Sequence, residues 1–128
     1  MYLGQVPFRD FSLPMGYGYW VIPALFFKIF GPYFYSLIKA QVLVNLISIF
    51  SFRSILKVLN VPPVVILFSV LVYCFSYVSF NFWPWYNNMV IAFELVAIYF
   101  ALRLVFTGPG WRFWLYAVLT GFFAFFSI

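Results

Sequence analysis

Four long apolar segments, separated by short turns, constrain the fold of this chain more than any other feature. They are residues 34–58, 62–80, 88–106 and 111–128. A membrane-spanning helix needs about 20 predominantly apolar residues, with a range of about 17–25. Proline and glycine interrupt the apolar pattern at 60–63 and 107–110, as is typical of tight turns. We therefore predict an all-α, polytopic membrane bundle with about four transmembrane helices, the last of them short.

The composition supports the lipid bilayer as the solvent and partner of this chain. Hydrophobic residues make up 67% and charged residues 7% of the 128 residues, against about 45–50% and about 25% in a typical soluble domain. A soluble domain this small would need far more polar surface to cover its core. The seven basic residues are scattered, so no basic stripe follows a nucleic-acid backbone. Soluble globular domains and nucleic-acid partners are thus excluded.

Few residues can carry chemistry. The chain has no histidine, two acidic residues (Asp10 and Glu94) and one cysteine, Cys74. A lone cysteine cannot form an intrachain disulfide. Within these residues the sequence also excludes His/Cys metal sites, a Ser-His-Asp triad and a catalytic histidine.

The N-terminal region differs from the apolar segments that follow it. Residues 1–15 are mixed in polarity, which predicts a loop outside the hydrocarbon. Residues 16–30 are apolar and aromatic, but they are too short to span and contain Pro23, so we expect a helix lying at the interface. The chain thus divides into 1–31, an extracytoplasmic loop with an interfacial helix, and 32–128, a transmembrane region, both within one larger domain.

Basic residues predict the orientation in the membrane. Those beside the two tight turns are Arg53, Lys57, Arg103 and Arg112. Antiparallel hairpins put both turns on one side, which the positive-inside rule makes cytoplasmic. The uncharged loop 79–88 and the segment with Asp10 then fall on the extracytoplasmic face. The last apolar segment ends without a cap or charged anchor, so we expect this chain to be a fragment.

Arg9 and Asp10 form a charged pair between aromatic residues near the N-terminus. At a membrane surface, Asp10 could serve as a general base, bind a divalent metal ion or orient a hydroxyl acceptor. Arg9 could hold a phosphate or pair with Asp10. The alternative is a solvated ion pair in a loop, which contributes little stability.

Lys39 and Glu94 lie inside the apolar segments. At about 1.5 Å per residue, each is expected about 9–10 Å below the same outer face. Ionisable groups in a span usually face the bundle interior with a partner. We therefore predict that Lys39 and Glu94 form a buried polar pair, or are joined through Gln41 or Asn45. Such a pair is a structural clasp or part of a catalytic or transport path.

The loop before the third apolar segment holds a second candidate group. Asn87 and Asn88 are suited to cap the following helix, since Asn is a preferred N-cap, or to hydrogen-bond a sugar or phosphate. Trp85 and Tyr86 are typical of an interfacial aromatic belt. Sugars also stack on such rings, so a binding platform is the alternative.

Several segments, taken in order, carry a family resemblance: Pro7-Phe8-Arg9-Asp10-Phe11, then 16–20, 25–31, 84–89 and 111–125. This order resembles the first extracytoplasmic loop, surface helices and following spans of GT-C type glycosyltransferases. That family includes dolichyl-phosphate-mannose protein mannosyltransferases and bacterial aminoarabinose and lipopolysaccharide sugar transferases.

The resemblance implies transfer of a sugar from a polyprenyl-phosphate carrier to an acceptor on the extracytoplasmic face. It implies that Asp10 is the loop acid at the donor or metal site and that Arg9 and Lys28 assist with the lipid phosphate. The chain departs from the family at Asn88, where many members have an acid, and it lacks their acidic motif after a first transmembrane helix. The fragment is not expected to catalyse alone.

Two other classes of protein remain as alternatives. One is a complete small four-helix membrane protein, such as a lipid-linked-sugar flippase or an accessory subunit, in which Lys39 and Glu94 would line a transport path. The other is a purely structural membrane subunit, which needs no functional acid.

Overall fold

The computed structural model describes residues 17–80 and 86–127, and the side chains of residues 21–79 and 87–127. The described residues form helices α1 (Tyr17–Phe30), α2 (Phe34–Val58), α3 (Pro63–Ser76), α4 (Tyr86–Val105) and α5 (Trp111–Phe126), with a short 3-10 turn, η1 (Val78–Phe80). No strand occurs among them, which confirms the all-α prediction. By length and composition, α2 and residues 87–105 of α4 could cross a membrane, whereas α3 and α5 are shorter apolar helices.

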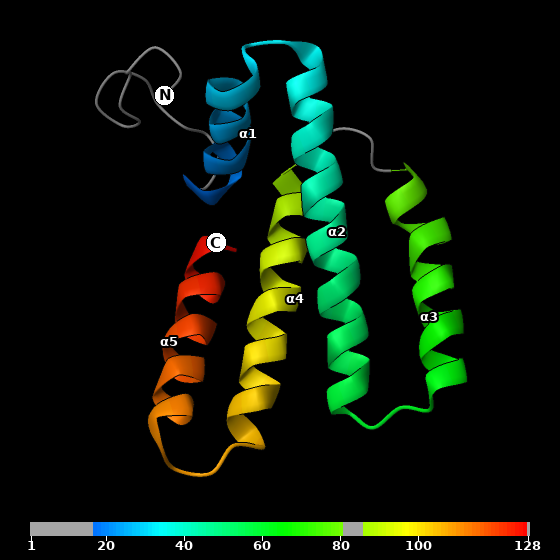
Figure 1. Cartoon of the computed structure of the whole chain (residues 1–128), viewed down its shortest axis with the longest axis vertical. Helices are drawn as coiled ribbons and strands as arrows, with labels where there is room; N and C mark the ends of the chain where they lie inside the picture. The colour runs from blue at the N-terminus through cyan, green and yellow to red at the C-terminus, as the bar shows by residue number, and fades with distance from the viewer. Residues whose placement is uncertain (1–16, 81–85, 128) are drawn as a thin grey trace.

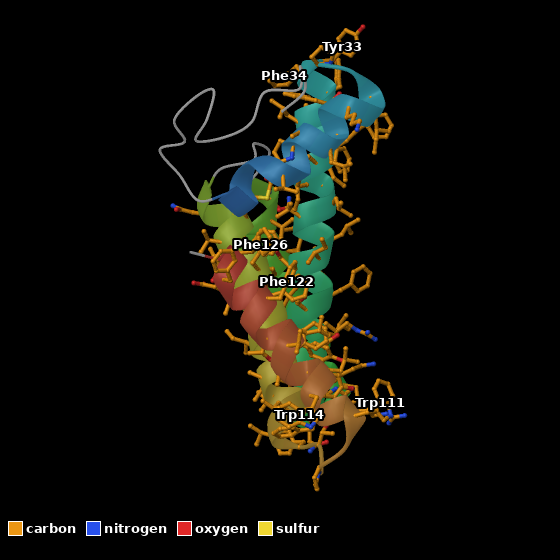
Figure 2. The ribbon with its side chains drawn as sticks, turned by 90° about the vertical axis from the view of Figure 1, so that its left-hand side faces the viewer. Tyr33, Phe34, Trp111, Trp114, Phe122 and Phe126 are labelled. Carbon is orange, nitrogen blue, oxygen red and sulfur yellow. The ribbon has the colours of Figure 1, made fainter. Side chains whose placement is uncertain are left out.

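The long helices lie side by side along the long axis, in the order α5, α4, α2, α3 (Figure 1). The closest packing is between α4 and α5 and between α2 and α4, whereas α3 packs only sparsely against α2. The turn between α2 and α3 and the turn between α4 and α5 lie at the same end, the lower end in Figure 1. α1 lies at the upper end, where it slants across the first half of α2 (Figure 2).

An asparagine ends α2. Asn60 has a φ of 57°, and Asn is one of the few residues other than Gly that adopts this left-handed conformation readily. The backbone N–H of Asn60 donates to the carbonyl of Lys57, and that of Val61 donates to the carbonyl of Leu56, both at 3.1 Å. These two bonds form a Schellman motif. Pro63 then begins α3 in the first helical turn, where its missing N–H leaves no bond unmade.

A glycine makes the turn from α1 into α2. Gly31 has a φ of 85°, and a Cβ built at this position would lie 2.7 Å from the ring of Tyr33. The Gly31 carbonyl accepts a hydrogen bond of 2.8 Å from the Ser36 hydroxyl. A residue with a Cβ would be strained at this φ and would also lie too close to the Tyr33 ring. The Gly31-Pro32 pair therefore ends α1, as the sequence predicts.

The core lies between α2 and α4. Val44, Met89 and Ala92 are almost fully buried, and Ile22 of α1 packs against them. Pro23 is buried beside Ile22. The proline inside α1 therefore sits on the packed face, and these two residues fasten α1 to the other helices.

Aromatic rings join α4 to α5. Phe93 stacks on Phe123 with ring centroids 6.3 Å apart, and Phe100 stacks on Phe123 and Tyr116 at 5.9 and 6.0 Å. The residues on each helix are seven apart, so they recur on one face after two turns. Because the helices run in opposite directions, this spacing stacks the rings one after another in the middle of the contact.

Large apolar side chains cover the outside of the bundle. Those on α2 and α3 include Leu43, Leu46, Phe50, Leu67, Phe68 and Phe75, all more than a third exposed. Tyr33 and Phe34 lie at the upper end, and Trp111 and Trp114 lie at the lower end (Figure 2). Soluble monomers rarely expose contiguous apolar surface on this scale. An apolar middle with aromatic residues toward both ends is typical of proteins surrounded by lipid.

Candidate functional site

Three of the predicted site residues, Arg9, Asp10 and Trp85, lie outside the described residues. Tyr86 is the first residue of α4, and its side chain also lies outside the described part. The catalytic and metal-binding roles assigned to Asp10 therefore stay predictions. The described residues near the predicted site belong to α1, α2, α4 and the end of α3.

A buried polar face runs along α2. Ser36, Gln41 and Ser48 are each at most 2% exposed. The side-chain amide of Gln41 donates to Oδ1 of Asn45 at 2.7 Å, and the Ser48 hydroxyl donates to the carbonyl of Val44 at 3.0 Å. Oε1 of Gln41 is buried and accepts no hydrogen bond from the described residues. A buried acceptor without a hydrogen bond is energetically costly. Oε1 of Gln41 is therefore a polar atom of the interior to which a hydrogen-bond donor could bind.

A hydrogen bond between side chains ties the end of α3 to the beginning of α4. The hydroxyl of Tyr77 donates to Oδ1 of Asn88 at 2.9 Å, and Asn88 is only 4% exposed. The ring of Tyr77 stacks on that of Tyr73 at 5.3 Å, and Tyr73 packs against Phe52 of α2 at 5.0 Å. Asn88 is thus held inside the protein by Tyr77. In this arrangement Asn88 positions the start of α4.

The structure does not bring Lys39 and Glu94 together. Both side chains are exposed, and no ion pair joins them among the described residues. The ammonium of Lys39 lies 4.0 Å from the ring centroid of Phe30, a cation–π contact. At about 100° per residue, Lys39 points away from the buried face of α2, and Glu94 points away from Met89 and Ala92. The predicted buried pair is therefore replaced by two outward-facing charges.

Neither Gln41 nor Asn45 links the two charges within the described residues. Gln41 and Asn45 bond to each other along α2, on a face that Lys39 does not share. The buried polar positions are thus held by amides and hydroxyls, which need no counter-charge when buried. Such groups can orient a ligand by hydrogen bonding, but they cannot move a proton at neutral pH.

The remaining predicted residues are exposed near the upper end. Lys28 is in the last turn of α1, and Asn87 is in the first turn of α4; both side chains are exposed. Among the described residues, no three His, Cys, Asp or Glu side chains lie together as a metal site would need. The exposed residues at this end provide a cation and an amide for an anionic or hydroxylated ligand.

A regular spacing in the sequence could have identified the buried polar face. Ser36, Ala40, Val44 and Ser48 recur every four residues, and all four are buried. Small residues at this spacing let two helices approach closely in a membrane. The residues on the buried face of α2 are therefore smaller and more often uncharged polar than those on its exposed face, which reverses the pattern of a soluble protein.

Comparison of the chain with protein-family models, with curated proteins and with solved structures finds no significant match.

Proposed function

We propose that this chain is the membrane-embedded part of a glycosyltransferase, which transfers a sugar from a polyprenyl-phosphate donor to an acceptor on the extracytoplasmic face. The observation that carries the proposal is the ordered set of segments that resembles the GT-C enzymes, from Pro7-Phe8-Arg9-Asp10-Phe11 to residues 111–125. The apolar outer surface of the bundle and the buried polar side chains of α2 and α4 support it.

In this proposal α2, α3 with η1, α4 and α5 all cross the bilayer. α2 is 25 residues long, or about 37 Å at 1.5 Å per residue, which exceeds a hydrocarbon core of about 30 Å. α3 and α5 have 14 and 16 residues. Shorter spans are accommodated by local thinning of the bilayer or by flanking side chains that reach the interface. The exposed apolar residues on both short helices support their contact with lipid.

The proposed orientation puts the lower end of the bundle in the cytoplasm. Four basic residues lie beside the two lower turns: Arg53, Lys57, Arg103 and Arg112. The positive-inside rule favours the cytoplasm for such an end. The opposite end, with α1 and the beginning of α4, then faces the extracytoplasmic side, together with Asp10 and the loop 79–88.

The proposed donor site lies at the upper end. Lys28 and Arg9 attract the lipid phosphate, while Asn87 and the rings of Trp85 and Tyr86 contact the sugar. Asn88, held by Tyr77, positions this end of α4. Asp10 accepts the proton of the acceptor hydroxyl. At the same time the hydroxyl oxygen forms a bond to the anomeric carbon of the sugar, and the bond from that carbon to the polyprenyl phosphate breaks, so that the phosphate leaves. A divalent metal at Asp10 is an alternative role for the same carboxylate.

The test is transfer of sugar from a labelled polyprenyl-phosphate donor in vesicles that contain the full-length protein. Asp10→Asn should abolish transfer, because the general base is lost, and should leave expression and membrane insertion normal. Glu94→Gln removes the same charge from an outward face of α4 and should retain transfer.

Transfer that survives Asp10→Asn would contradict the assigned site. A wild-type protein that moves labelled lipid-linked sugar across the bilayer without transferring it would instead support the flippase alternative. Membrane insertion itself is checked separately, by resistance to alkaline extraction.

A further inference from the structure

The lower end of the bundle contains a hollow that the proposed glycosyl transfer does not use. It lies between α2 and α3 and encloses about 520 Å³. Arg53 and Lys57 line it from α2, and Asn60 lines it from the turn. The α3 side of the hollow is apolar and includes Pro63, Ile66, Leu67 and Val70. One hollow thus combines a cationic rim with an apolar wall.

A second hollow adjoins the first. It encloses about 350 Å³ and shares Lys57 and Asn60 with its neighbour, while Arg103 and Phe106 of the α4 end complete it. The two hollows therefore bring three cations, from α2 and α4, around the Asn60 turn. These cations are separated in the sequence by as many as 50 positions, and only the packing of α2 on α4 brings them together.

The positive charge at this end is not neutralised within the described chain. Arg53 and Lys57 make no ion pair or hydrogen bond among the described residues. Arg103 uses Nε to donate to the hydroxyl of Tyr99 at 3.2 Å, which leaves its other N–H groups available. Glu94 is the only described acidic residue. It precedes Arg103 by nine residues, or roughly 13 Å along α4, and lines neither hollow.

The hollows lie at the end of the bundle that bears Trp111 and Trp114 (Figure 2), both about 70% exposed. Tryptophan is enriched at the level of lipid headgroups. The apolar wall continues along α3, where Leu67 and Leu71 are exposed. A ligand with a phosphate at the rim and a hydrocarbon chain along α3 would match both surfaces at once.

We propose that the hollow between α2 and α3 binds one phospholipid with an anionic headgroup, whose phosphate contacts Arg53 and Lys57 and whose headgroup extends toward Arg103 in the adjoining hollow. An acyl chain of this lipid lies along Ile66, Leu67 and Val70. Arginine binds phosphate through paired N–H groups, and basic pockets between transmembrane helices are suited to anionic headgroups. The proposal rests on the membrane-embedded part of the proposed function and not on the transferase activity.

A free phosphate ion would satisfy the cations equally well, but it would leave the apolar wall of α3 without a partner. A phospholipid covers that wall and brings the charge with it. The lipid is therefore the occupant that fits the whole surface.

The first experiment compares two lipids on the unmodified full-length protein in nanodiscs or detergent, by native mass spectrometry. Phosphatidylglycerol should bind at least tenfold more tightly than phosphatidylcholine, because only the former adds net negative charge to the cationic rim. Equal retention of the two lipids would overturn the proposal. This comparison needs no variant, so it does not depend on the folding of a mutant.

The second experiment locates the site. Arg53→Gln and Lys57→Gln should each weaken phosphatidylglycerol binding about fivefold to tenfold. Arg112→Gln is the matched control, because Arg112 is a cation at the same end that lies over Trp111 and lines neither hollow. It should change binding less than twofold. Equal losses in all three variants would show diffuse attraction by surface charge and would overturn the assigned site.

The third experiment separates lipid from free phosphate. Val70→Trp fills the apolar wall and should weaken phosphatidylglycerol binding while glycerol phosphate binding stays unchanged. Inorganic phosphate that binds as tightly as the lipid would overturn the choice of occupant. Asp10→Asn should retain phosphatidylglycerol binding, so a failure of the transferase proposal and a failure of this one are distinguishable.

Discussion

Helix α2 makes two contacts that differ sharply, one with α4 and one with α3. Its contact with α4 is close and contains the buried core cluster of Val44, Met89 and Ala92. Its contact with α3 is sparse, and Ile66 is the only buried residue that α3 contributes. Two hollows lie between α2 and α3, whereas the hollow that α2 shares with the end of α4 is smaller and lies at the lower end, beside Asn60.

Side-chain size explains this difference. On either side of Val44, the α2 face toward α4 carries small residues, Ala40 and Ser48, so the two backbones approach closely. At the α3 contact two large rings, Phe52 of α2 and Tyr73 of α3, lie between the helices with centroids 5.0 Å apart. Lipid is as apolar as leucine, so association of helices in a membrane depends on close packing and hydrogen bonds. The contact between α2 and α3 therefore leaves room for the proposed lipid, whereas the close contact of α2 with α4 around Val44, Met89 and Ala92 does not.

The largest expected effect compares Met89→Ala with Ile66→Ala, since each truncates a buried side chain at one of the two contacts. Met89→Ala should lower the free energy of unfolding by about 2–5 kcal/mol, because it leaves a cavity in a packed interface. Ile66→Ala should cost about 2 kcal/mol or less, because Ile66 already borders a hollow. Titration with SDS in mixed micelles measures both values.

Leu71→Ala is the control for these two variants, because Leu71 is 42% exposed on α3. It should change the free energy of unfolding by less than about 0.5 kcal/mol. A loss at Ile66 as large as the loss at Met89 would contradict the distinction between the two contacts.

A smaller effect is expected from the hydrogen bond that ties α3 to α4. Tyr77→Phe removes the donor to Asn88 and should lower the free energy of unfolding by about 0.6–1.5 kcal/mol. Tyr35→Phe removes the same group from a side chain that is 73% exposed and should have no measurable effect. The same titration tests both, and identical results for the two would mean that the hydrogen bond does not stabilise α3.

The smallest effect is expected at Glu94. Because its side chain is exposed and unpaired among the described residues, Glu94→Gln should leave the free energy of unfolding within about 0.5 kcal/mol of the wild type. The yield of folded protein, measured by gel filtration, should likewise be unchanged. A loss comparable with that of Met89→Ala would restore Glu94 as half of a buried pair.

Much of the fold could be predicted from the pattern of apolar runs and turn residues. The helix over residues 34–58 agrees with α2 at both ends, and the breakers at Gly31, Asn60 and 107–110 separate helices as expected. These features are local, because a proline or a left-handed residue acts on its own backbone. The buried face of each helix was harder to predict, since α2 exposes its large apolar residues and buries its small polar ones.

The candidate site was less predictable for the same reason. Asn87 and Asn88 are adjacent in the sequence, yet one is exposed and the other is buried and bonded to Tyr77. Nothing in the local sequence distinguishes them, because burial depends on how α3 ends beside α4. Likewise, Gln41 and Lys39 are two positions apart on α2, and the rotation of this helix against α4 decides which of them enters the interior.

The amino-acid sequence alone was sufficient to predict an apolar chain whose described residues are mainly helical, and most of the places where its helices stop, although α3 ends at Ser76 and not at residue 80. These properties follow from transfer free energies and backbone preferences, which act residue by residue. The pairing of α2 with α4, the outward position of Lys39 and Glu94 and the gathering of Arg53, Lys57 and Arg103 required the three-dimensional structure. Each depends on which helix faces fit closely together, and that fit is a property of two surfaces at once.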